Sequence, residues 1–335
     1  MRPTRPAVLL AACLLAGSTA LTACGDPAPA PADGKPQVVT TVAPLTSIVA
    51  SVVGDRADVH GLVPEGTNSH TFDPPPSAGR VLGEADVVFL NGLQLEEPTK
   101  KLAESTKRAD ARIVELGPAV LPERDYIYDF SFPKEEGKPN PHLWTDPTYA
   151  VKYADTVRDT MIQLDPGNAA TYRRNAEAFD RKANALAGAL RADQRSIPED
   201  RRELLTYHDA YAYFARTFGW KVVGAIQPKN FEDPTPQEIA GLIEQVKRDK
   251  VTAIFGSEVF PSKVLEQIGA ATGVRYVDVL RDDDLPGSPG APEHSWLGLM
   301  RFDYVTIVES LGGTAPALKA LDTHEDTVSH ADYPQ

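Results

Sequence analysis

Short β-branched segments alternate along this chain with segments of helical spacing, and the alternation occurs in two separate series. In the first series the strand-like segments are 37–41, 59–63, 86–92 and 111–117. In the second series they are 203–207, 221–226, 251–255 and 274–278. Because strands that alternate with helices pair in parallel, we expect an α/β fold of two lobes, each with a mostly parallel four-stranded sheet.

A long helical pattern separates the two series. Its apolar residues follow one another in steps of three and four: Ala169, Tyr172, Ala176, Phe179, Ala183, Leu186 and Leu190. This spacing places them on one face, so we expect a long rigid helix that joins the lobes. The expected boundaries are an N-terminal lobe at 37–165, a linking helix at 166–197, a C-terminal lobe at 198–321 and a disordered polar tail at 322–335.

The amino-terminal region has the pattern of a bacterial export signal. Two arginines precede an apolar run from about Ala7 to Leu21, and Cys24 follows directly after Leu-Thr-Ala. This arrangement resembles a lipobox, so we expect a lipoprotein signal peptide at 1–23 and lipidation of Cys24. Residues 24–36, rich in proline and small side chains, are typical of a flexible tether. We therefore expect an extracytoplasmic protein, in the periplasm or at the cell surface, held to the outer face of the cell membrane by its lipid.

Three histidines and one aspartate stand where the loops of such a fold meet. His70 and His208 each follow a predicted strand, and Asp278 closes another. Loops at the carboxyl ends of parallel strands line the ligand crevice, so we expect these side chains at one edge. His142 comes from an irregular loop before a helix. Four ligands from two lobes are therefore predicted to converge in one cleft.

Three imidazoles and one carboxylate suit a transition-metal ion. Neutral imidazole suits zinc, whereas manganese prefers more oxygen ligands, so Zn²⁺ is the predicted ion and Mn²⁺ the alternative. If none of them binds the ion, Asp282 to Asp284 would form a solvated acidic turn. We interpret His60 and His294 as structural residues and Glu258 as a residue that supports a ligand. The formal net charge of -13, without a Lys/Arg cluster, argues against nucleic acid as a partner.

Five segments, taken together and in order, resemble one protein family. They are 41–45, 66–74, 142–147, 207–214 and 276–280. With them the chain looks like the metal-specific solute-binding lipoproteins of ABC importers, the cluster A-I group for zinc and manganese. The resemblance implies two α/β lobes around one metal ion, with His70, His142, His208 and an aspartate as ligands. Asp278, followed by Val279 and Leu280, matches the position of that aspartate. Asp283 is the alternative, because Asp284 and Leu285 follow it with the same spacing.

The function that this resemblance implies is capture of Zn²⁺ outside the cytoplasmic membrane and delivery to an ABC permease, by a monomer that is not an enzyme. A Mn²⁺ receptor is the alternative within the family. A surface adhesion lipoprotein and a zinc hydrolase are alternatives of other classes. Catalytic zinc sites keep a position for water, and the chain has neither a His-Glu-x-x-His nor a Gly-x-Ser-x-Gly pattern, which disfavours the hydrolase.

Overall fold

The computed structural model of this 335-residue chain describes residues 34–226, 234–257, 263–324 and 331–332. The predicted signal peptide, the lipidation site Cys24 and the supporting residue Glu258 lie outside the described residues. Lys35–Gln335 form one compact unit, separate from Met1–Gly34. In the part of the chain that the structure describes, no helix is both long and apolar enough to cross a membrane.

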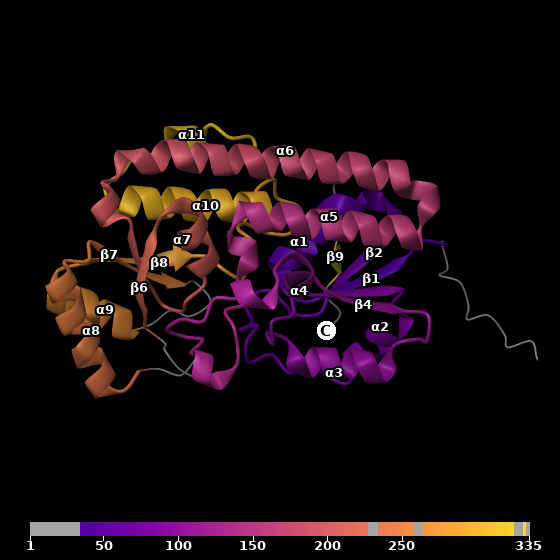
Figure 1. Ribbon diagram of the computed structural model, residues 1–335, viewed down its shortest axis with the longest axis horizontal. Coiled ribbons are helices and arrows are strands. Elements are labelled where there is room, and N and C mark those ends of the chain that lie inside the picture. The colour runs from indigo at the N-terminus through magenta and orange to yellow at the C-terminus, as the bar shows by residue number, and fades with distance from the viewer. Residues whose placement is uncertain (1–33, 227–233, 258–262, 325–330, 333–335) are drawn as a thin grey trace, which may run out of the picture. The chain divides into compact units, whose positions relative to one another are not determined.

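The first lobe is built on a parallel sheet of short strands. These are β1 (Gln37–Thr40), β2 (Asp58–Gly61), β3 (Val87–Leu90), β4 (Arg112–Glu115) and β9 (Ala331–Asp332), in the order β4-β3-β1-β2-β9. The helices of this lobe are α1 (Ala43–Val53), α2 (Ala78–Glu84), α3 (Glu97–Thr106) and α4 (Leu116–Val120) (Figure 1). All four residues of β3 are buried, which is typical of a strand covered on both faces.

The strand β9 corrects one expectation from the sequence. Residues 322–335 were expected to form a disordered tail, but Val59 pairs with Ala331 and His60 with Asp332 in a parallel ladder. Thr323 is also buried, at 5% exposure. A two-residue strand is too short to show a period, and its pairing depends on β2, which is far away in the sequence.

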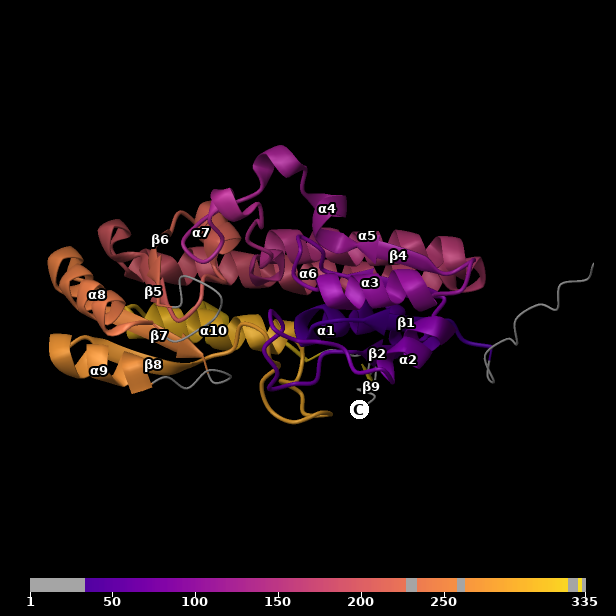
Figure 2. The same ribbon diagram turned by 90° about the horizontal axis from the view of Figure 1, so that it is seen from below.

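The second lobe repeats the architecture with four parallel strands. They are β5 (Glu203–Thr206), β6 (Lys221–Ala225), β7 (Ala253–Ser257) and β8 (Arg275–Leu280), in the order β6-β5-β7-β8. The helices are α7 (Ala212–Phe218), α8 (Pro236–Asp249) and α9 (Lys263–Thr272). Figures 1 and 2 both show α8 and α9 side by side, at the end of this lobe away from α1. The two-lobe α/β prediction is confirmed.

Four further helices complete the two lobes. They are α5 (Pro147–Leu164), α6 (Ala169–Asp193), α10 (Trp296–Ser310) and α11 (Pro316–Lys319). The long helix α6 packs against α1 and α5 of the first lobe and against α10 and α11, as Figure 1 shows. One apolar core includes Val38 of the first sheet and Phe255 of the second. The lobes are therefore joined by shared packing as well as by the chain, which limits large hinge motions.

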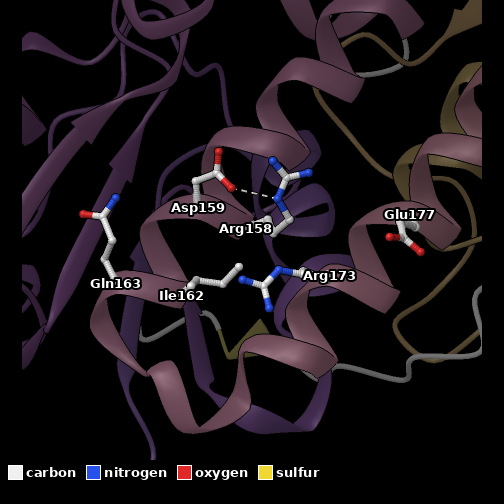
Figure 3. A pocket seen from close by; sticks show the side chains of 6 residues that line it. All are labelled: Arg158, Asp159, Ile162, Gln163, Arg173 and Glu177. Carbon is white, nitrogen blue, oxygen red and sulfur yellow. Dashed lines mark hydrogen bonds and ion pairs between the residues drawn. The ribbon is translucent and has the colours of Figure 1, made fainter.

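Single turns of 3₁₀ helix connect the larger elements. They are Gly54–Arg56, Glu123–Asp125, Lys134–Glu136, Leu143–Thr145, Pro166–Asn168, Gln194–Ser196 and Glu199–Arg201. A groove of about 420 Å³ lies between α5 and α6 and is lined mainly by charged side chains (Figure 3). Arg158 contacts Asp159 there, with Nε 2.8 Å from Oδ1. None of the predicted ligands lines this groove.

Candidate metal centre

His70 is held by a local turn in the loop that follows β2. The side-chain oxygen of Asn68 accepts a hydrogen bond of 2.9 Å from the backbone N–H of His70. An asparagine that bonds to the backbone two residues later forms an Asx turn, which fixes the direction of the chain. The ring of His70 is partly exposed, and its centroid lies 5.7 Å from that of Phe132.

His142 sits in an equivalent turn that also fixes its tautomer. Asn140 Oδ1 accepts a hydrogen bond of 3.0 Å from the backbone N–H of His142 and lies 2.9 Å from its Nδ1. Because an amide oxygen only accepts, Nδ1 carries the proton and Nε2 keeps its lone pair. The amide nitrogen of Asn140 donates in turn to Asp129 Oδ2 at 2.8 Å and to the carbonyl of Asp209 at 2.6 Å. This arrangement orients His142 as a metal ligand.

His208 follows the carboxyl end of β5, as the sequence predicts. Its carbonyl accepts hydrogen bonds from the Thr206 hydroxyl at 2.7 Å and from the Ala210 N–H at 3.0 Å. The side chain is buried, at 3% exposure for the residue. The turn therefore points a buried imidazole out of the end of the sheet.

The three rings meet at their Nε2 atoms. Nε2 of His142 lies 3.1 Å from Nε2 of His70 and 3.2 Å from Nε2 of His208. Such close approach of three ring nitrogens is what a shared cation requires, since zinc binds imidazole nitrogen at about 2.0–2.1 Å. The structure thus brings together the three histidines that the sequence predicted.

Asp278 does not join them. The strand β8 continues to Leu280, beyond the predicted end at 278, so Asp278 lies inside the strand and its side chain is exposed. Among the described residues, it belongs to neither group of side chains that could hold a metal ion. The structure does not bring Asp278 to the histidines, because the strand continues two residues beyond the end expected from the sequence.

The alternative, Asp283, lies with the histidines. Its carboxylate and that of Asp282 form a second potential metal group with His208, and both aspartates are buried. Ser69, beside His70, donates a hydrogen bond of 2.7 Å to Asp283 Oδ2. The other oxygen, Oδ1, is buried and has no hydrogen-bond partner among the described residues. An unpaired buried carboxylate oxygen is costly unless a cation or proton satisfies it.

The segment 282–284 is not a solvated turn, because Asp282 and Asp283 are both buried. Oδ2 of Asp282 lies 2.7 Å from Nε2 of His208. Asp284 accepts hydrogen bonds from the backbone N–H of Gly66, at 3.0 Å to Oδ1 and 2.7 Å to Oδ2. Nearby, Nε2 of His294 lies 3.0 Å from Glu65 Oε1. These contacts join the second-lobe segment after β8 to the first-lobe loop that carries His70.

Burial sets the charge state of the cluster. It lowers the pKa of His70 and His142 well below 6.5, and it lowers the pKa of His208, where the charge of Asp283 opposes the shift. Burial also raises the pKa of Asp282 and of Asp283 to about 7. The imidazoles are therefore neutral and able to ligate at neutral pH, whereas the carboxyl groups favour a cation that replaces their protons.

Helix α10 fixes the loops that carry these ligands. Asp303 accepts hydrogen bonds from the Tyr211 hydroxyl at 2.8 Å and from the Arg281 N–H at 3.0 Å. Tyr304 donates from its hydroxyl to the carbonyl of Thr145 at 2.6 Å. One helix thus holds the segments after His142, after His208 and before Asp282.

One sequence signal could have identified this geometry. Asparagine precedes histidine by two positions at both Asn68 and Asn140, and both asparagines form the same turn. The buried Asp282 gave no comparable signal, because a run of three aspartates is usually solvated.

The fold and the cluster define a two-lobed protein in which side chains from both lobes could hold a metal ion. Residues 38–310 match the family model described as "Zinc-uptake complex component A periplasmic", and the chain belongs to this family. It is therefore a metal-binding receptor of the ABC-importer type and not an enzyme.

Individual relatives bear names for different metals. The chain is 31% identical to the iron-binding protein YfeA of Yersinia pestis, over 82% of this chain and 86% of that protein. It is 28% identical to the manganese-binding lipoprotein MntA of Halalkalibacterium halodurans, over 82% and 88%. The periplasmic zinc-binding protein TroA of Treponema pallidum has a similar structure, with a TM-score of 0.74, 25% identity and coverage of 83% and 99%.

Proposed function

We propose that this protein captures Zn²⁺ outside the cytoplasmic membrane and delivers it to the permease of an ABC importer. One observation carries the proposal: Nε2 atoms of two histidines from distant loops lie within 3.2 Å of the Nε2 of a third, next to a buried carboxylate. The proposed ligands are His70, His142, His208 and Asp283. Mn²⁺ is the alternative cargo.

The choice of zinc follows from the imidazoles. Three neutral nitrogen donors and one oxygen donor suit Zn²⁺, whereas Mn²⁺ suits sites with more oxygen. Relatives named for iron, manganese and zinc support a first-row divalent ion as the class of cargo.

The amino-terminal pattern supports the location. We propose that residues 1–23 are removed as a signal peptide, that Cys24 carries the lipid and that residues 24–36 tether the folded unit to the membrane. Relatives named as lipoproteins support this anchor. We further propose that the receptor acts as a monomer, with lobes at 37–165 and 198–321 and a linking helix at 166–197.

Release to the permease must overcome the contacts that close the centre. The shared core and α6 limit a large hinge motion. The contacts of Gly66 with Asp284 and of Glu65 with His294 involve only loop groups, so we propose that they separate when metal leaves.

The test compares zinc binding by the purified protein and by a variant with His70→Ala, His142→Ala and His208→Ala. Equilibrium dialysis should give one Zn²⁺ per wild-type chain and no tight binding by the variant. His324→Ala is a matched control, because His324 is exposed and its hydrogen bonds with Lys182 and Asp322 are made by its backbone atoms. Stoichiometric, undiminished zinc binding by the triple variant would refute the proposal.

A further inference from the structure

The side chain of Asp282 has surroundings that the four proposed ligands do not explain. It is buried at 3% exposure, and its Oδ2 has no hydrogen-bond partner among the described residues. The same oxygen lies 2.7 Å from Nε2 of His208, the nitrogen proposed to bind the ion. An imidazole nitrogen and a carboxylate oxygen at this distance need a proton between them or a cation beside both, because two lone pairs repel each other.

Metal binding by His208 would prevent it from donating a hydrogen bond to Oδ2 of Asp282. Once Nε2 of His208 binds a metal ion, it has no proton to donate. Oδ2 of Asp282 would then be a buried anionic oxygen beside a cation and without a donor. Direct coordination satisfies that oxygen, and it needs no new contact from the protein.

The spacing of the donor atoms allows Asp282 to share a metal ion with His208. For bonds of about 2.1 Å, neighbouring donors lie about 3.4 Å apart in a tetrahedron and about 3.0 Å apart where they meet at right angles. The observed separations are 3.1 Å for His70–His142, 3.2 Å for His142–His208 and 2.7 Å for His208–Asp282. The two imidazole–imidazole separations lie between these values, and the His208–Asp282 separation is shorter than both, so Asp282 lies within reach of an ion bound at His208.

The backbone holds Asp282 in this position. The carbonyl of Asp282 accepts a hydrogen bond of 2.9 Å from Trp144 Nε1, and Trp144 is fully buried. Asp303 accepts the N–H of the preceding residue, Arg281, at 3.0 Å. Backbone contacts on both sides of Asp282 therefore hold its side chain against His208.

We propose that Asp282 is a fifth metal-binding side chain and that it extends the cargo from Zn²⁺ to divalent ions that require more oxygen, Mn²⁺ and Fe²⁺. This proposal rests on the proposed function. With Asp282 and Asp283 both bound, the centre offers three nitrogen and two carboxylate donors. Without Asp282 it offers the three-nitrogen, one-oxygen set of a four-coordinate zinc site.

The test measures the affinities for Mn²⁺ and Zn²⁺ separately in Asp282→Asn and Asp282→Ala. Each is obtained by competition with a chelator of known affinity, under anaerobic conditions at one pH. We expect the Mn²⁺ affinity to fall by about tenfold or more and the Zn²⁺ affinity by about threefold or less, since imidazole donors dominate zinc binding. Asp278→Asn is the matched control, because Asp278 is exposed and lies just before the same segment.

Bound Co²⁺ gives a second readout that does not depend on affinity. Four-coordinate Co²⁺ absorbs visible light much more strongly than five- or six-coordinate Co²⁺. The wild type should give weak bands, and Asp282→Ala should give intense ones, while circular dichroism of the metal-free proteins confirms that both are folded.

Equal losses for the two ions, or identical Co²⁺ spectra, would overturn the role of Asp282 and leave the receptor function intact. Failure of the wild type to bind any of these ions would instead refute the proposed function. The two failures are therefore distinguishable.

Discussion

At the scale of single residues, two aspartates of one short segment have opposite surroundings. Asp278 is exposed inside β8, whereas Asp283 is buried beside His208 and accepts a hydrogen bond from Ser69. Each stands two residues before a leucine, so the sequence around them does not distinguish them, and only the position at which β8 ends does. A boundary error of two residues, which is ordinary for elements read from sequence, is enough to exchange a ligand for a surface residue.

This difference predicts the effect of removing each carboxylate. Asp283→Asn should lower the Zn²⁺ affinity by at least about 100-fold, which exceeds the roughly 10- to 100-fold cost of losing a group that only supports a ligand. Asp278→Asn should leave it unchanged. Chelator competition measures both affinities, and the unfolding temperatures of the metal-free variants show whether each is folded. Equal effects of the two changes would contradict the assignment of Asp283.

At the residue scale, the histidines could be predicted and Asp282 could not. His70 and His208 follow strands whose apolar pattern is clear, so their position at the end of a parallel sheet follows from topology. The burial of Asp282 depends instead on contacts with Trp144 and His208, which the chain brings together only after folding. No local pattern encodes such contacts.

At the scale of elements, helix α10 packs against α6 and β8 and carries the buried carboxyl group of Asp303. Burial raises the pKa of Asp303 from 3.8 to about 7, although the donors Arg281 and Tyr211 favour its ionised form. Between pH 3.8 and about pH 7, the Asp303 carboxyl group is therefore protonated in the folded protein but ionised in the unfolded chain. The contribution of this group to stability is therefore greatest below about pH 3.8 and is lost as the pH rises through 7.

Asp303→Asn should remove this pH dependence. The unfolding temperature of the metal-free variant, relative to the wild type, should rise steadily between about pH 5 and pH 8, because asparagine never ionises. Differential scanning calorimetry in the presence of a chelator measures the difference. Glu309→Gln on the same helix is the control: Glu309 is exposed, so its difference from the wild type should stay nearly constant. A constant difference for Asp303→Asn would contradict the raised pKa.

The elements themselves were largely predictable. Strands β1 to β8 correspond to short β-branched or apolar runs, and helices α5, α6 and α10 follow an apolar period of about 3.6 residues, which a sequence shows directly. The short helix α11 and the strand β9 have no such period, and both depend on neighbours from other parts of the chain.

At the scale of the whole molecule, the proposed metal centre lies between two lobes that already share one core. Since this core is continuous, the described unit should unfold in one transition rather than lobe by lobe. An ion that binds only the folded state stabilises it by roughly 2.7 kcal/mol at a hundredfold excess over its dissociation constant. Zinc should therefore raise the unfolding temperature by several degrees without splitting the transition, and a chelator should reverse the shift. Calorimetry with and without Zn²⁺ measures this, and two separate transitions would contradict it.

The pairing of Ala331 and Asp332 with β2 also bears on solubility. An uncovered outer strand exposes a row of backbone donors and acceptors that another polypeptide can extend, which is a common route to aggregation. Here residues 331–332 pair with β2 and cover the outer edge of the first sheet. Loss of residues 331–332 would uncover β2 and should leave a molecule more prone to self-association.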